Sequence, residues 1–300
     1  MSDKPRYINA GGKLLDLDTP VVMGILNVTP DSFYKGSRYN SDSEILQSAS
    51  DMLEQGAGII DVGGYSSRPG AKDVSEEEEG SRVLRAIKLI KDNFPEAIIS
   101  VDTFRAEIAK RAVEECGALI INDISGGEGD KAMFDVVTKL NVPYIMMHMQ
   151  GDPRTMQNNP VYDDIVADIL KWFGERIYRL RCNGVKDIII DPGFGFGKTA
   201  DHNFEMLSRL NDFSVAGLPI MVGISRKSMI WKTLMISAEE ALNGTTALNA
   251  IALASGADIL RVHDVKEAVQ VVQLVNRIKK SEIDMRPKTE DGHLRNSFGG

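Results

Sequence analysis

The sequence predicts a single barrel of eight parallel strands with helices between them, and three observations support this fold class. One unit recurs along the chain: a helix-like stretch, a glycine, a short β-branched run and a polar residue where the run ends. Counting every short apolar run gives eight candidate strands, and no linker or low-complexity tract interrupts them. The runs lack polar alternation, which is typical of parallel strands covered on both faces. One closed α/β barrel is therefore favoured over the alternative, a doubly wound sheet.

The eight predicted strands follow one another in chain order. They are Val21 to Leu26, a run ending near Val62, Ile98 to Val101, a run ending at Asp123, Tyr144 to Met147, a run ending at Asp191, Ile220 to Ile224, and a run ending at Val262. Four glycines just before a run are expected to end the preceding helices in the left-handed conformation: Gly56, Gly117, Gly184 and Gly256. In such a barrel the carboxyl ends of the strands meet on one face, so we expect the active site there.

A capping-box spacing predicts the first residue of several helices between these strands. The pairs are Ser75 with Glu78, Ser237 with Glu240, and Asp264 with Glu267. We expect residues 1–280 to form the barrel together with a short N-terminal cap. The polar segment 281–300, rich in Lys, Glu, Asp and Gly, is expected to be a mobile tail.

Composition narrows the class of protein. A chain of 300 residues with 43% hydrophobic and 26% charged residues is typical of a folded globular protein. A net charge of -8 disfavours a dedicated nucleic-acid binder, so an anionic ligand needs a locally basic pocket. Cys116 and Cys182 are too few and too far apart for a disulfide scaffold and are expected to be packing residues. Without a signal-like start or a long apolar run, the chain is expected to be cytoplasmic.

Oxygen acceptors stand where several apolar runs stop. They are Asp102, Asn122, Asp123 and Asp191. A carboxylate accepts two parallel hydrogen bonds, so a pocket of such groups suits a flat heterocycle that carries an amino group beside a ring N–H. Capping of the following helix is the alternative for Asp102 or Asp123 taken alone.

Cations follow the last two runs. Lys227 in SRKS, Arg261 and His263 in RVHDV, and Arg68 could together hold a diphosphate. A phosphate site built by the last two strands is a recurrent use of this fold. A solvated helix residue is the alternative for Lys227, and a capping or core-edge histidine is the alternative for His263.

Two further positions leave alternatives open. The amide oxygen of Asn27 could bind a hard cation such as magnesium, or it could cap the turn before Pro30. His148 could be a base, a ligand or a structural residue, and no histidine spacing in the chain forms a zinc site. The stretch DVGGYSSRPG suits a loop that closes over an anion, with a plain glycine-rich surface loop as its alternative.

Seven motifs between about Val21 and Val265 resemble, in their order, those of the dihydropteroate synthases of folate biosynthesis. They are MGILNVTPDSF, DVGGYSSRPGA, SVDTF, INDISGG, DPGFGFGKT, GISRKS and RVHDV. The resemblance implies a (β/α)8 TIM-barrel transferase that joins 6-hydroxymethyl-7,8-dihydropterin diphosphate to 4-aminobenzoate and releases diphosphate, with Mg2+ as cofactor. It also implies small-molecule substrates, no nucleic-acid or membrane partner, a homodimer, and competition by sulfonamides.

The resemblance also implies roles for individual residues. The pterin edge would be bound by Asp102, Asn122 and Asp191, with Lys227 reaching the ring and the aminobenzoate side. The diphosphate would be held by Arg261, His263 and, with magnesium, Asn27. The aminobenzoate pocket would be ordered by Ser67, Arg68, Pro69, Phe33, Phe196 and Ser225. The residues implied as catalytic are Asp102, Asp191, Lys227, Arg261 and His263.

The chain departs from the family's usual pattern in one loop. Tyr65 stands where the family usually has Glu, and Ser67 stands where it usually has Thr. Two other functions therefore stay open. One is a pterin-binding methyltransferase domain that serves a corrinoid partner, against which SRKS and the cationic RVHDV argue. The other is an inactive pterin-binding subunit.

Overall fold

The computed structural model describes residues 7–29, 41–66, 74–151, 156 and 160–284. Eight parallel strands lie side by side in the order β8-β7-β6-β5-β4-β3-β10-β9. Their bounds are β3 (Val21–Asn27), β4 (Ile59–Gly63), β5 (Ile99–Asp102), β6 (Ile120–Asp123), β7 (Tyr144–Met147), β8 (Ile188–Asp191), β9 (Met221–Val222) and β10 (Ile259–Val262). A parallel bridge between Ile190 and Ile220 joins the two ends of this sheet. The predicted barrel is confirmed, and the doubly wound alternative is wrong.

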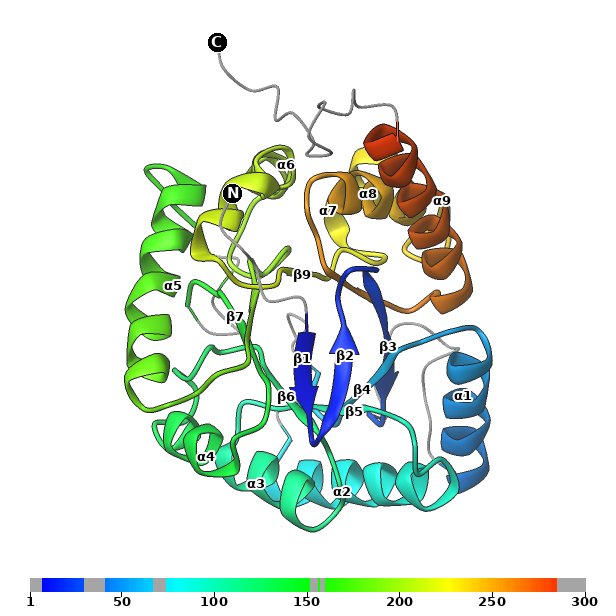
Figure 1. The fold of residues 1–300 in the computed structure, drawn as a ribbon, viewed down its shortest axis with the longest axis vertical. Helices are drawn as coiled ribbons and strands as arrows, with labels where there is room; N and C mark the ends of the chain where they lie inside the picture. The colour runs from blue at the N-terminus through cyan, green and yellow to red at the C-terminus, as the bar shows by residue number, and fades with distance from the viewer. Residues whose placement is uncertain (1–6, 30–40, 67–73, 152–155, 157–159, 285–300) are drawn as a thin grey trace, which may run out of the picture.

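Helices form an outer ring around these strands (Figure 1). They are α1 (Asp42–Glu54), α2 (Glu76–Asn93), α3 (Ala106–Glu114), α4 (Met133–Leu140), α5 (Ile165–Cys182), α6 (Ala200–Ser208), α7 (Ser228–Leu234), α8 (Leu242–Ala254) and α9 (Val265–Asp284), with the 3-10 helix η2 (Leu210–Ala216) after α6. Their apolar faces pack on the outer face of the barrel in one large cluster that contains Leu26, Val62 and Phe173. Both faces of the strands are thus buried, which explains their continuous apolar runs.

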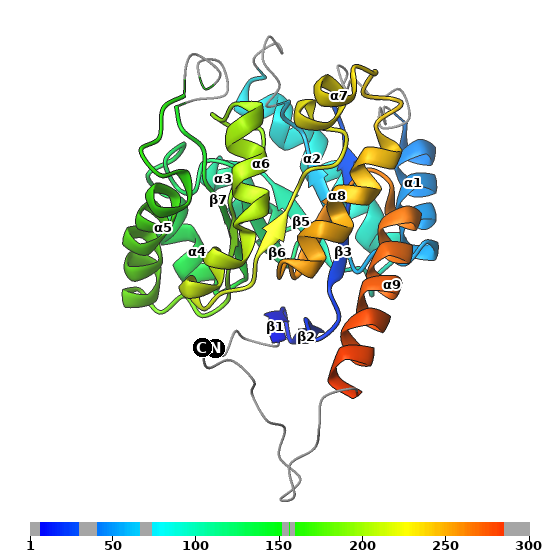
Figure 2. The same ribbon diagram turned by 90° about the horizontal axis from the view of Figure 1, so that it is seen from above.

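An N-terminal hairpin covers one end of the barrel. Strands β1 (Tyr7–Ala10) and β2 (Lys13–Asp16) pair in antiparallel fashion. Ile8 and Leu15 of the hairpin are buried against interior side chains near the N-terminal ends of the strands, among them Met23, Ile59 and Ile259. Figure 2 shows the hairpin below the strands, at the end opposite α7. This hairpin corresponds to the short cap expected from the sequence.

The predicted ends of four helices are confirmed. The glycines that follow them have positive φ angles: 97° at Gly56, 81° at Gly117, 89° at Gly184 and 99° at Gly256. A residue with a β-carbon adopts this conformation only at a cost, which is why glycine stands there.

Of the three predicted capping boxes, all within the described part of the chain, only the one at Ser75 lies at the start of a helix with the expected capping hydrogen bond. Ser75 caps α2, because its hydroxyl accepts a hydrogen bond from the backbone N–H of Glu78. The backbone N–H of Ser237 donates to Glu240 at 2.9 Å, yet α8 begins only at Leu242. The carboxylate of Asp264, directly before α9, accepts instead from a distant arginine, Arg226.

Three other expectations concern the ends and the surface of the chain. Helix α9 continues to Asp284, four residues into the segment expected to be a tail, and residues 285–300 lie outside the described residues. Cys116 packs against the core as expected, whereas Cys182 is exposed at the end of α5, so a packing role is wrong for it. Within the described part of the chain, no helix combines the length and the apolar character that crossing a membrane requires.

Candidate active site

A polar layer lies directly above the apolar interior of the barrel. Ile59, Ile120, Ile189 and Ile259 belong to the interior cluster. Because successive side chains of a strand point to opposite faces, the residue two positions further along each strand faces the interior again. Those residues are Asp61, Asn122, Asp191 and Arg261. The sheet therefore carries two carboxylates, an amide and a guanidinium inside the barrel toward its carboxyl end.

Arg261 is the centre of this layer. Its Nε donates to Oδ2 of Asp61 and its Nη2 donates to Oδ2 of Asp102, both at 2.6 Å. Nδ2 of Asn122 donates to the same Oδ2 of Asp61 at 3.0 Å. Burial raises the pKa of Asp102 to about 7, and the charge of Arg261 opposes that rise. Strands β4, β5, β6 and β10 are thus joined by one network of charge-assisted hydrogen bonds.

Asp191 and Lys227 form a second part of the site. Oδ1 of Asp191 accepts from the backbone N–H of Gly193 at 2.8 Å, and burial raises the pKa of this carboxyl while Lys227 opposes it. Burial lowers the pKa of Lys227 to about 8, with Asp191 opposing. A β-carbon built on Gly223 would lie 3.7 Å from Cβ of Arg261, 3.9 Å from Nζ of Lys227 and 4.0 Å from Oδ2 of Asp191. The ammonium of Lys227, the carboxylate of Asp191 and the base of the Arg261 side chain therefore border the space beside Gly223.

Phe196 and Lys227 lie against each other. Nζ of Lys227 is 4.6 Å from the centre of the Phe196 ring, within reach of a cation–π contact, and donates to the backbone oxygen of Phe194. The loop after β8 and the loop after β9 thus share one wall of the site.

Ser225 and His263 connect the ends of the last two strands. Oγ of Ser225 lies 3.1 Å from Nδ1 of His263 and accepts from the backbone N–H of His263 at 3.2 Å. Ser225 is buried and His263 is partly exposed. The structure therefore brings both predicted residues to the same edge of the site.

Asn27 lies at the end of β3, beside the acidic group. A β-carbon on Gly63 would be 3.4 Å from Oδ1 of Asn27 and 3.3 Å from Oδ2 of Asp102, so the two oxygens flank this glycine. Amide and carboxylate oxygens are ligands that Mg2+ accepts, with water and substrate phosphates completing the coordination. Among the residues that the structure describes, no cluster of three His, Cys, Asp or Glu side chains is arranged to hold a metal ion. The oxygens of Asn27 and Asp102 fit a magnesium ion for which phosphate groups of a bound substrate and water would supply most of the ligands.

His148 has a structural environment. Its Nδ1 lies 3.0 Å from Nζ of Lys198, and both side chains are buried. Lys198 also donates to the backbone oxygen of Phe196 at 2.9 Å. Burial, together with the charge of Lys198, lowers the pKa of His148 to about 2, so the ring is a neutral acceptor. This arrangement favours the structural interpretation of His148.

Two acidic positions differ from the sequence-based interpretation. Asp123 does not join the acceptor set, because its carboxylate accepts from the backbone and hydroxyl of Ser125, the backbone of Gly127 and the hydroxyl of Tyr144. It shapes the turn after β6. Asp61 was missed, although it is fully buried at the centre of the network. Its distance of two residues from the interior Ile59 is the signal that could have identified it.

The loop expected to close over the substrates is only partly described. Ser67, Arg68 and Pro69 lie outside the described residues, as does Phe33. Tyr65 is described, and its ring packs edge-on against Phe104 with centroids 5.1 Å apart.

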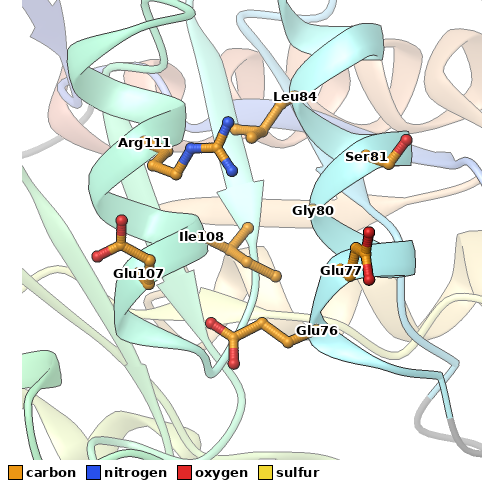
Figure 3. A pocket seen from close by; sticks show the side chains of 8 residues that line it. All are labelled: Glu76, Glu77, Gly80, Ser81, Leu84, Glu107, Ile108 and Arg111. Atoms are coloured by element: carbon orange, nitrogen blue, oxygen red, sulfur yellow. The ribbon is translucent and has the colours of Figure 1, made fainter.

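A groove at the surface lies away from this site. It is lined by α2 and α3, and Figure 3 shows Glu76, Glu77 and Glu107 around it. No predicted site residue lines it. The strand-end cluster is therefore the candidate active site.

A barrel whose strand ends carry acceptors for a heterocycle and cations for an anion defines a pterin-binding enzyme, and residues 23–263 match the family described as pterin binding enzyme. Dihydropteroate synthase of Escherichia coli (strain K12) is 46% identical over 268 residues, which cover 89% of this chain and 94% of that one. The enzyme of Haemophilus influenzae is 43% identical over 258 residues, covering 85% and 93%. The chain belongs to the dihydropteroate synthase family, as its motifs indicated.

Solved structures agree with this assignment. Yersinia pestis dihydropteroate synthase with a sulfonamide drug complex superposes with a TM-score of 0.88 at 41% identity, covering 91% of this chain and 99% of that one. The Xanthomonas albilineans enzyme with 4-aminobenzoic acid gives a TM-score of 0.83 at 36% identity, covering 91% and 98%. The chain is accordingly a transferase of folate biosynthesis that moves a pterin group.

Proposed function

We propose that the strand-end residues of this chain divide the dihydropteroate synthase reaction among them. In that reaction 6-hydroxymethyl-7,8-dihydropterin diphosphate and 4-aminobenzoate give 7,8-dihydropteroate and diphosphate. The observation that carries the proposal is that Asp191 and Lys227 reach the space beside Gly223, where the side chain of Arg261 begins, while the guanidinium of Arg261 meets Asp102. Acceptors for a heterocycle edge and donors for an anion meet there, as a substrate with both parts requires.

Asp102, Asn122 and Asp191 bind the edge of the pterin ring. The carboxylates accept from the amino group and ring N–H of the heterocycle. Asn122 donates through Nδ2 to Asp61, so its carbonyl oxygen is directed to the other side and can accept from the ligand. Asp191 is held by the backbone N–H of Gly193, which fixes the orientation of its carboxylate.

The diphosphate falls to Arg261, His263 and Asn27. Arg261 has five N–H groups, of which the Nε group and one on Nη2 already meet carboxylates, and the rest can donate to phosphate oxygens. Asn27 would hold a magnesium ion by its amide oxygen. That ion, when bound, neutralises negative charge on the diphosphate.

The transfer needs no nucleophile from the protein. The bond between the pterin methylene and the diphosphate oxygen breaks, the amine nitrogen of 4-aminobenzoate forms the new C–N bond, and this nitrogen then loses a proton. The dihydropterin ring donates electrons to the methylene as the leaving group departs. The protein holds both reactants in line and stabilises the charge that develops on the diphosphate, which is the task of Arg261 and His263.

The aminobenzoate side falls to Phe196, Ser225 and Lys227, together with Ser67 and Arg68 outside the described residues. Lys227 lies over the Phe196 ring, so a cation and an aromatic face are available to a benzoate. Sulfonamides, which resemble the arylamine, are expected to compete there. Tyr65 and Ser67 are the positions at which this chain is expected to differ from its relatives in affinity.

Three further expectations accompany this function. The barrel with its N-terminal cap is proposed to span residues 1–280, with helix α9 continuing to Asp284, and the rest of the predicted tail lies outside the described residues. The protein is proposed to be a cytoplasmic homodimer. A pterin-binding methyltransferase would have little use for the cations at the ends of β9 and β10, which is why this alternative is not favoured.

Incubation of the purified protein with the pterin diphosphate, 4-aminobenzoate and Mg2+ tests the proposal by the release of diphosphate and 7,8-dihydropteroate. Both products should form, and neither should form without 4-aminobenzoate. Asp102→Asn and Arg261→Met should reduce turnover at least about 100-fold, whereas Arg111→Met in the surface groove should leave it unchanged. Tight binding of the pterin ester without any product would instead identify an inactive homologue.

A further inference from the structure

We infer that Asp61 is a positioning residue for this reaction: it fixes the guanidinium of Arg261 and the amide of Asn122 relative to each other. The diphosphate-binding cation and the pterin-binding amide are thereby presented to one substrate in a single geometry. The inference rests on the proposed function of those two residues and adds a residue to which the sequence motifs gave no role.

Burial gives the first argument. Asp61 is fully buried, and a buried carboxylate is strongly destabilising unless it is paired and hydrogen-bonded. Within the described part of the chain its partners are Arg261 and Asn122, two residues of the candidate site. Its other oxygen, Oδ1, is buried without a hydrogen-bond partner in that same part. A carboxylate that served packing alone would be replaced at less cost by an apolar side chain.

Geometry gives the second argument. Nε of Arg261 at 2.6 Å and Nδ2 of Asn122 at 3.0 Å converge on the same oxygen, Oδ2. One atom on β4 therefore sets the separation between a group on β10 and a group on β6. Loss of this atom would leave each group free to move independently of the other.

The direction of the guanidinium gives the third argument. Nε of Arg261 donates to Asp61 and Nη2 donates to Asp102. The two carboxylates therefore occupy the edge of the guanidinium that carries Nε and Nη2. The edge that carries Nη1 is left for a ligand, and a diphosphate can accept two parallel hydrogen bonds from such an edge. Without Asp61 the guanidinium would be held through Nη2 alone and could rotate. Asp61 thus selects which edge of Arg261 faces the substrate.

The test compares Asp61→Asn with the wild-type protein. The amide keeps the size of the side chain and can accept only with its oxygen, without the charge that holds Arg261 and Asn122 together. Binding of three probes is measured: the pterin diphosphate, the same pterin alcohol without diphosphate, and inorganic diphosphate with Mg2+. Steady-state kcat and KM are measured for both substrates. Ser100→Ala is the matched control, because Ser100 pairs with Asp61 in the register of β4 and β5 and is also buried.

In Asp61→Asn we expect affinity for the pterin diphosphate and for inorganic diphosphate to fall about 10- to 100-fold, and kcat to fall at least about 10-fold. The KM for 4-aminobenzoate should stay within about 3-fold, since a positioning role concerns the other substrate. Ser100→Ala should match the wild type in every measurement. Wild-type affinities and kcat in Asp61→Asn, or equal losses for all ligands including 4-aminobenzoate, would overturn the inference.

A second variant covers failure of the first to fold. Asp61→Glu keeps the charge and moves it by one methylene, so it should fold and still lose affinity for the pterin diphosphate. Wild-type affinity in this variant would also contradict a positioning role. Absence of 7,8-dihydropteroate formation by the wild-type protein would instead disprove the proposed function, while the diphosphate probe would still report on Asp61.

Discussion

Arg226 and Asp264 form a two-point ion pair that joins the loop after β9 to the start of α9. Nε and Nη2 of the arginine lie 2.9 Å and 2.8 Å from the two carboxylate oxygens, and only 8% and 12% of the two side chains are exposed. Arg226 also has a positive φ of 54°, which is unusual for a residue with a side chain. The loop that carries Ser225 and Lys227 is thereby fixed beside the strand that carries Arg261.

Asp264→Asn should therefore lower both stability and activity. It removes the charge from a nearly buried pair, and the free energy of unfolding should fall by about 1 to 3 kcal/mol. Activity should fall as well, because Lys227 would lose its fixed distance from the end of β10. Urea unfolding and kcat/KM measure the two effects. Glu115→Gln, which breaks the exposed pair with Arg111, is the control and should unfold like the wild-type protein. Equal small effects in both variants would contradict this prediction.

Asp102 and Lys227 should set the two limbs of the pH profile. Burial raises the pKa of Asp102 to about 7, against the opposing charge of Arg261. Burial lowers the pKa of Lys227 to about 8, against the opposing charge of Asp191. The carboxylate forms as the pH rises through the first value, and the ammonium is lost as it rises through the second. A reaction that needs both charged groups should show a bell-shaped kcat/KM with its maximum between these values.

Rates measured from about pH 6 to about pH 9 check this profile. Lys227→Arg keeps a positive charge across the range, so any remaining activity should lose the alkaline limb. Ser100→Ala keeps both groups and should retain both limbs. A profile that is flat across this range in the wild-type protein would rule out these assignments.

His148 should make the fold sensitive to acid. The pKa of its imidazole falls from the usual 6.5 to about 2 on folding, chiefly because the ring is buried. Below pH 6.5 the unfolded chain binds a proton that the folded chain does not, so stability is complete above pH 6.5 and decreases as the pH falls toward 2. Between pH 7 and pH 5 this group alone should cost about 2 kcal/mol.

His148→Gln isolates that effect, because the amide oxygen can accept from Lys198 but does not titrate. Urea unfolding at both pH values should show a difference about 2 kcal/mol smaller than in the wild type. Lys198 faces the ring and burial lowers its pKa well below the usual value, so its titration contributes to the pH dependence of both proteins. The same pH dependence in both proteins would show that the ring is protonated in the fold.

Asn27 should control the requirement for magnesium. After chelation with EDTA, activity should disappear and return on addition of Mg2+. In Asn27→Ala the half-saturating Mg2+ concentration should rise about 10-fold or more, because one oxygen ligand is lost. Asn93→Ala on α2 is the control and should titrate like the wild type. Unchanged magnesium dependence in Asn27→Ala would place the ion elsewhere.

The strands could be predicted from the sequence because burial of both faces leaves an unmistakable apolar run. The end of β8 at Asp191 was predicted to the residue, whereas β5 continues one residue past the predicted Val101 and includes Asp102. That these residues meet follows from barrel closure, which a sequence pattern supplies only through the fold class. The grouping of Asp102, Asn122 and Arg261 is thus confirmed, while the roles of these residues stay predictions.

The contacts that the sequence analysis did not predict depend on which of several possible partners a side chain binds in the folded protein. Asp264 was expected to cap a helix, but a guanidinium from the neighbouring loop offers two charged hydrogen bonds and takes both oxygens. The pairing of Lys198 with His148 joins residues fifty positions apart and depends on burial, which no local pattern reveals. Asp61 lies within the run that was predicted to end near Val62, but the sequence does not reveal that its side chain faces the interior of the barrel.

The hairpin of β1 and β2 determines at which end of the barrel small molecules can enter and leave. Among the described residues, Ile8, Leu15 and their neighbours fill the N-terminal end of the barrel with apolar side chains. Entry and exit are thereby confined to the opposite end, where the polar layer begins. The incoming arylamine and the departing diphosphate must therefore use the same opening. The molecule that binds deeper in the barrel must enter before, and leave after, the molecule that binds nearer the opening.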